Sequence, residues 1–141
     1  MSLELDLLPF DYEDNTMSYA HSKLECVSNC HDLYDEIEKY QKSIGQLNSL
    51  KVMEVDYNPK KDKRCVPKNF TSFFGCDDKY EEAHYGLTTT DPYGVPIRWL
   101  YVKELLQWKN HAGVLRNVKH RAVWAYLEQL DPETKVALVW S

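Results

Sequence analysis

The chain has few glycines and lacks the glycine-rich loops that hold phosphate groups. Its five glycines are scattered over 141 residues, and neither G-x-G-x-x-G nor G-x-x-x-x-G-K-[ST] occurs. No serine lies in a G-x-S-x-G elbow, the turn with which many hydrolases present a nucleophile. The sequence therefore carries none of the commonest signatures of nucleotide-dependent enzymes or serine hydrolases.

Long apolar runs are also absent, as is positive charge at the N-terminus. No stretch approaches the roughly 18 apolar residues that a membrane-spanning helix needs. Residues 1–14 contain five Asp or Glu and no Lys or Arg, whereas a secretory signal begins with basic residues. We therefore expect a cytoplasmic protein with no membrane partner, in which the four cysteines are reduced thiols.

The length of the chain is typical of one domain. We predict a single domain over residues 1–141. A chain of this size buries roughly two thirds of its surface on folding, so it needs neither a metal nor a disulfide.

The N-terminal residues alternate between apolar and acidic side chains. Leu3, Leu5 and Leu7 are separated by single acidic residues, and this period of two predicts a short half-buried strand. An acidic docking arm over residues 1–14 has the same composition and is the alternative.

From Met17 onward the apolar period lengthens to three and four residues, which predicts one helix that ends near Gly45. Acid-first pairs such as Asp35 with Lys39 support the exposed side of this helix. Its predicted apolar stripe consists of Ala20, Leu24, Val27, Cys30, Tyr34, Ile37, Tyr40, Ile44 and Leu47.

The remaining chain alternates short strands and helices. We expect strands at Met53–Tyr57, His84–Thr90, Ile97–Tyr101 and Lys135–Trp140, helices at Lys103–His111 and Leu115–Leu130, and an irregular, loop-rich segment over 58–83. The sequence Asp91-Pro92-Tyr93-Gly94 suits a type I turn, so its flanking strands should form a hairpin. The apolar run at the C-terminus is typical of a strand covered on both faces.

Together these elements predict an α+β fold. We expect a small, mostly antiparallel sheet packed with three helices, in the order β-α-β-β-β-α-α-β.

Two cysteines and two histidines lie within HSKLECVSNCH, residues 21–31. On the predicted helix Cys26 and Cys30 are one turn apart, but His21 and His31 point to other sides. The spacing also differs from that of common zinc sites. We therefore interpret these cysteines as small core residues. The alternative is a zinc-stabilised structural domain whose four thiolates are Cys26, Cys30, Cys65 and Cys76.

Acidic residues gather before the predicted hairpin. Glu81, Glu82 and Asp91 could hold Mg²⁺ with His84 as a base, which would make a small metal-dependent phosphoester hydrolase or nuclease. Runs of charge are usually solvated, and we favour a solvated acidic turn that holds no cofactor.

Basic residues crowd the start of the predicted helix Leu115–Leu130. A helix N-terminus carries partial positive charge, so cations are unfavourable there and an anion is favourable. An acidic protein surface, a phosphate-bearing ligand or a nucleic-acid backbone would meet this requirement. The candidate binding residues are Arg116, Lys119, His120, Arg121, Lys109 and His111, with Arg98 and Lys103 as further possibilities.

Charge is unevenly distributed along the chain. Residues 1–40 hold ten Asp or Glu and two Lys, a net charge of −8, whereas residues 41–141 hold twelve acidic and fifteen basic residues, a net charge of +3. The acidic region could cover the basic helix end within one molecule, that end could bind an external partner, or the charges could simply be solvated.

We therefore expect a non-enzymatic binding or regulatory domain, of the kind that small inhibitors and phage accessory proteins represent. The composition does not specify an oligomeric state.

Overall fold

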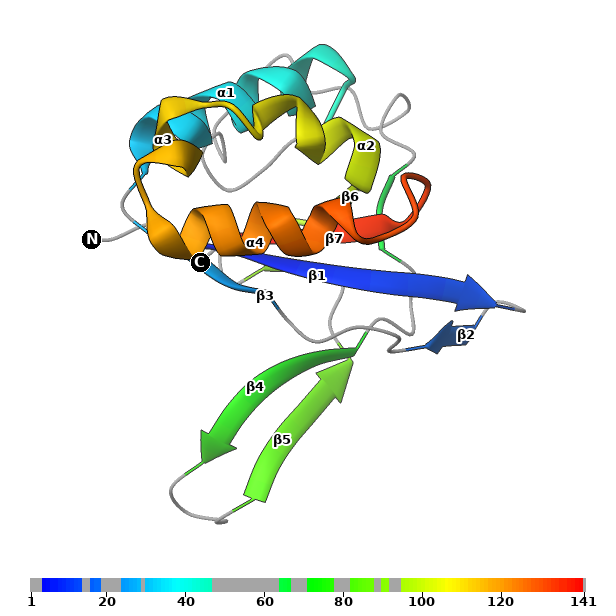
Figure 1. The fold of residues 1–141 in the computed structure, drawn as a ribbon. Helices are drawn as coiled ribbons and strands as arrows, with labels where there is room; N and C mark the ends of the chain where they lie inside the picture. The colour runs from blue at the N-terminus through cyan, green and yellow to red at the C-terminus, as the bar shows by residue number, and fades with distance from the viewer. Residues whose placement is uncertain are drawn as a thin grey trace.

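The computed structural model of the chain describes residues 4–13, 16–18, 24–28, 30–46, 64–66, 71–77, 82–87, 90–91 and 95–140. Within these residues an antiparallel sheet carries a layer of helices on one face (Figure 1). This arrangement confirms the predicted α+β class.

Five strands form the main sheet. They are β1 (Glu4–Glu13), β2 (Thr16–Ser18), β3 (Leu24–Ser28), β6 (Arg98–Tyr101) and β7 (Lys135–Trp140). The order is β2-β1-β7-β6, and β3 pairs with the N-terminal part of the β1 edge whose C-terminal part pairs with β2. Strand β7 thus lies in the middle, and the predicted strand over Leu3, Leu5 and Leu7 extends to Glu13.

The side chains of β1 and β7 alternate between two apolar clusters. Leu5 and Leu7 face the helices, whereas Leu8 and Phe10 belong to a smaller cluster on the other face. On β7, Val136 and Leu138 face the helices and Ala137 faces the smaller cluster, so the strand is covered on both faces as its apolar run predicted.

Short helices form the second layer. They are α1 (His31–Ser43), α2 (Val102–Leu105), the 3₁₀ turn η2 (Leu106–Trp108), α3 (Ala112–Leu115) and α4 (Val118–Glu128). The helix predicted over Lys103–His111 corresponds to α2 and η2. The one predicted to begin at Leu115 begins at Val118, and α3 precedes it as a separate turn.

The prediction of one long helix from Met17 is wrong for the first half of that segment. Residues Thr16–Ser18 and Leu24–Ser28 are strands that pair with β1, and helix α1 begins only at His31. The edge of β1 would otherwise present unpaired backbone groups, and satisfying them outweighs a helical spacing of apolar residues. The prediction holds from Leu33 onward, where Leu33, Tyr34 and Ile37 are buried.

The predicted hairpin across Asp91–Gly94 is reduced to an antiparallel bridge between Thr90 and Pro96. Strand β5 (Glu82–Leu87) instead pairs with β4 (Thr71–Asp77), and Figure 1 shows this pair on the side of the main sheet opposite to the helices. Strand β6 has no edge left for β5, because it pairs with β7 on one side and bridges to Cys65 on the other.

Two further predictions concern the stretch between α1 and β6. The loop-rich segment 58–83 is only partly irregular, since β4 and the start of β5 lie within it. The strand predicted at Met53–Tyr57 lies outside the described residues. No helix among the described residues is long and apolar enough to span a membrane.

Candidate binding groove beside helix α4

Two capped helix starts shape the corner between η2 and α4. The His111 side chain accepts a hydrogen bond from the Gly113 backbone N–H at 2.9 Å and starts α3. The Asn117 side chain accepts from the N–H groups of Lys119 at 2.9 Å and His120 at 3.2 Å and starts α4. The chain itself therefore satisfies these N-terminal donors. The anion predicted at the start of this helix is not needed to satisfy them.

His120, one of the predicted ligand-binding residues, is buried. Only 2% of it is exposed, and its Nδ1 lies 2.8 Å from the Gly113 carbonyl oxygen. A carbonyl oxygen can only accept, so Nδ1 carries the proton and donates. The ring joins α4 to α3, which makes His120 part of the packing of this corner.

The remaining basic residues do not form one surface. Lys119 and Arg121 are two residues apart on α4, a rotation of about 200°, so they flank opposite sides of the helix. Arg116 closes α3, and its guanidinium nitrogen lies 3.9 Å from the Asp32 carboxylate. This contact links the acidic N-terminal region to Arg116. Because both side chains are mostly exposed, it contributes at most about 1 kcal/mol to stability.

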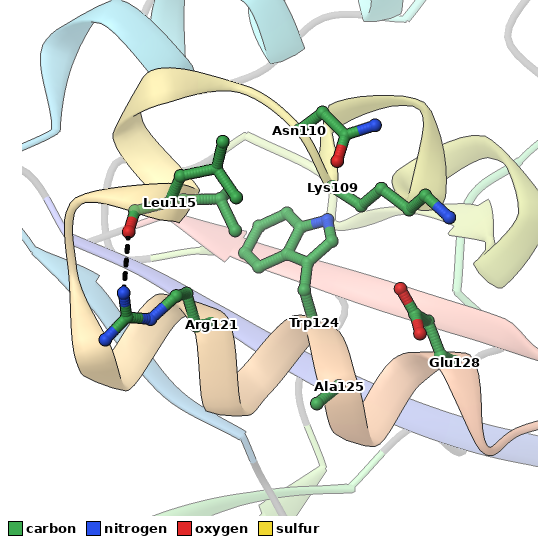
Figure 2. A pocket seen from close by; sticks show the side chains of 8 residues that line it. Lys109, Asn110, Leu115, Arg121, Trp124, Ala125 and Glu128 are labelled. Atoms are coloured by element: carbon green, nitrogen blue, oxygen red, sulfur yellow. Dashed lines mark hydrogen bonds between the residues drawn. The ribbon is translucent and has the colours of Figure 1, made fainter.

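Lys109 and Arg121 share an open groove of about 260 Å³. Figure 2 shows Arg121 and Glu128 rising from α4 on either side of Trp124, with Lys109 and Asn110 opposite them. The groove, called the α4 groove below, is lined by Lys109, Asn110, Val114, Leu115, Arg121, Trp124, Ala125 and Glu128.

Beneath the α4 groove lies a fixed indole ring. Trp124 is 2% exposed, and its indole N–H donates to the Leu105 carbonyl oxygen at 3.0 Å, which fixes the ring. At one end, Arg121 donates to the Leu115 carbonyl oxygen at 3.1 Å (Figure 2). Leu115 itself remains 47% exposed. The groove therefore combines polar and apolar side chains, with a positive group on each wall and the exposed Leu115 among its apolar residues.

A second cluster, which was not predicted from the sequence, joins cations to the rings of β6. Arg64 lies 5.1 Å and 5.2 Å from the ring centres of Trp99 and Tyr101, Lys103 lies 4.9 Å from that of Tyr101, and Lys135 lies 5.0 Å from that of Trp99. The spacing of Trp99 and Tyr101 on one strand face could have indicated the rings, but their cations come from distant segments. Because these cations already lie over the rings, the cluster binds its own chain together.

Glu104 connects this cluster to α1. Its carboxylate is 10% exposed and accepts hydrogen bonds from the Tyr40 hydroxyl, from Arg64 and from the Tyr101 backbone N–H, the last at 3.0 Å. Burial raises the pKa of Tyr40 to about 12, and the hydrogen bond to Glu104 and its negative charge act in the same direction, while Arg64 opposes them.

The residues proposed for metal-dependent chemistry are only partly described. The Asp91 carboxylate is buried and accepts from the Val95 backbone N–H at 3.0 Å. Glu81 lies outside the described residues, and Glu82 and His84 belong to β5, where the side chains fall outside the description.

The cysteines are similarly dispersed among the described elements. Cys30 lies at the start of α1 and Cys65 in the bridge to Arg98, while Cys26 and Cys76 belong to β3 and β4. No group of three or more His, Cys, Asp or Glu that could hold a metal occurs within the part of the chain that the structure describes.

Comparison with protein-family models, with curated proteins and with solved structures found no match to this chain.

Proposed function

We propose that this protein is a non-enzymatic binding module that holds a short acidic segment of a partner protein in the α4 groove. The observation that carries the proposal is an open groove with Lys109 and Arg121 on its two walls and the exposed Leu115 among its lining residues. Small inhibitors and accessory proteins act through surfaces of this kind.

The size of the groove supports a peptide rather than a cofactor. Sites for drug-sized molecules and cofactors usually measure roughly 300–1,000 Å³, whereas this groove measures about 260 Å³ and is open to solvent. One or two side chains of a segment would fill the groove, and the exposed Leu115 would provide the apolar contact.

The charges of the groove support an acidic segment. Lys109 and Arg121 give two positive charges against the single negative charge of Glu128. Lys109 and Arg121 are both exposed, so their charges can interact with a partner. Such exposed charges mainly accelerate association and select the partner, while the apolar contact provides most of the affinity.

The test uses two sets of short synthetic peptides with the same apolar framework. One set has Asp and Glu at the variable positions, and the other has Lys. We expect the acidic set alone to bind and to change tryptophan fluorescence. Lys109→Glu should weaken that binding by about tenfold, which corresponds to about 1.4 kcal/mol. Arg121→Glu should have a similar effect.

Lys119→Glu is the matched control, because it makes the same change of charge on the side of α4 away from the groove. Binding to this variant should stay within about twofold of the wild-type value, since distant exposed charges are screened. Equal losses in Lys109→Glu and Lys119→Glu would contradict the proposal. So would binding of nucleotides or oligonucleotides but of neither peptide set. A cytoplasmic location for this interaction remains a prediction from the acidic N-terminus.

A further inference from the structure

The exposed face of α4 is unusually apolar for a helix at a surface. The buried face consists of His120, Val123, Trp124 and Leu127. The opposite face presents Val118, Ala122, Ala125 and Gln129 to solvent, at successive steps of four, three and four residues. Helix α4 therefore presents Val118 and two alanines on this face, followed by the polar Gln129 at its C-cap, and no described element covers them.

Large apolar side chains are concentrated at this helix. The three that are most exposed among the described residues are Leu115 at 47%, Val118 at 72% and Tyr126 at 37%. All three lie on α4 or immediately before it. Of the three, Val118 lies on the exposed face of α4 and Tyr126 on its flank, whereas Leu115 ends α3 and lines the α4 groove.

Charged residues beside this face suit a second copy of the same helix. Arg121 and Glu128 are seven residues apart, so they lie on the same flank of α4, at the two ends of the apolar face. If two α4 helices pack antiparallel and cross between Ala122 and Ala125, Arg121 of each copy lies opposite Glu128 of the other. On the other flank, Lys119 of each copy lies opposite the Tyr126 ring of the other.

We propose that the protein self-associates through antiparallel packing of α4 against α4 of a second copy. The steps of four, three and four residues are those of a coiled-coil seam. Alanine at the crossing point lets the two backbones approach closely, and Val118 packs near Gln129 of the other copy. A two-fold axis makes every contact occur twice, as in most homodimers.

The dimer does not depend on the acidic segment proposed above, but the two surfaces share Arg121, Ala125 and Glu128. A second copy and a bound segment therefore exclude each other. By linkage, an acidic peptide that binds the monomer shifts the equilibrium away from the dimer.

Sedimentation equilibrium of charge variants tests the antiparallel arrangement. Arg121→Glu places two acids opposite each other, and Glu128→Arg places two bases there. Either change should raise the dissociation constant of the dimer by about tenfold. The double variant Arg121→Glu/Glu128→Arg restores opposite charges. Because the two residues interact across the interface, its dissociation constant should return to within about twofold of the wild-type value. Thermal unfolding monitored by circular dichroism should show that all three variants are folded.

A wild-type protein that stays monomeric up to about 1 mM would overturn the proposal. A double variant that dissociates as readily as the single variants would overturn it as well. Ala122→Glu places a charge at the crossing point and should abolish the dimer, yet Ala122 does not line the α4 groove. Peptide binding by this monomeric variant therefore tests the groove separately from self-association.

Discussion

Several buried polar side chains among the described residues bond to particular atoms of neighbouring elements. His120 donates to Gly113 in the corner before α4. Gln41 donates to Gln46 at 3.0 Å, and Gln46 in turn donates to the Trp99 carbonyl oxygen at 3.2 Å, which ties the end of α1 to β6. A buried polar group without a partner costs about 1–3 kcal/mol, so these contacts fix positions that apolar packing alone would leave loose.

The contact between Tyr40 and Glu104 predicts a loss of stability in alkaline solution. The pKa of Tyr40 is about 12 in the folded chain, against 10.0 for an ordinary tyrosine. Below pH 10 both states are protonated and the stabilisation is complete. Between pH 10 and 12 the unfolded chain releases the proton first, so the free energy of unfolding falls as pH rises.

Denaturant unfolding of the wild type and Tyr40→Phe, measured between pH 8 and pH 12, isolates this contribution from the other tyrosines. The wild type should be more stable than the variant at pH 8, and the difference should shrink towards pH 12. A difference that is constant over this range would show that the Tyr40 hydroxyl has an ordinary pKa.

Close approach of α1 to α3 depends on Gly113. A Cβ atom at this position would lie 2.4 Å from the Cys30 sulfur and 3.1 Å from Nδ1 of His111. Gly113→Ala should therefore destabilise the protein by about 1–3 kcal/mol, despite the better helix propensity of alanine. The free energy of unfolding in denaturant measures this cost.

Removing the sulfur should relieve the clash. In a Cys30→Ala background, Gly113→Ala should cost at least about 0.5 kcal/mol less than it does in the wild type. Additive effects of the two substitutions would mean that Cys30 does not pack against α3. The thiol of Cys30 therefore has a structural role in this packing.

Elements whose apolar side chains follow one clear spacing could be predicted from the sequence. Elements whose conformation depends on pairing with another strand could not. The apolar run Lys135–Trp140 and the periodic residues of α4 specify their structures locally. Residues 24–28 have apolar spacing compatible with a helix, and only the unpaired edge of β1 makes them a strand. Strand β5 pairs with β4 because β6 is already paired on both sides.

Which basic residues share a surface depends on where helix α4 begins. Moving the start of α4 from Leu115 to Val118 separates Arg116 from the helix and lets Asn117 cap it. Each residue on a helix corresponds to about 100° of rotation. The side that a basic residue faces is therefore set by the rotation of α4 in its packing, which turns His120 inward and Lys119 away from the groove.

At the scale of the whole molecule, helix α4 packs beside α3 and η2 on one face of the sheet and leaves another of its sides open to solvent. The helix meets the core through four buried side chains, lines the α4 groove on one flank and presents an apolar face to solvent. One helix thus supports the fold, the proposed peptide site and the proposed dimer. A ligand in the groove and a second copy both act on Arg121, which couples recognition to self-association.

Amide NMR spectra of the monomeric Ala122→Glu protein, recorded during titration with an acidic peptide from the binding set, test the central claim most directly. We predict progressive shifts of the signals of Lys109–Leu115 and Arg121–Glu128, including the indole N–H of Trp124, with little change at Lys119. Shifts that centre on Trp99 and Tyr101, or spectra that do not change, would contradict a function that depends on the α4 groove.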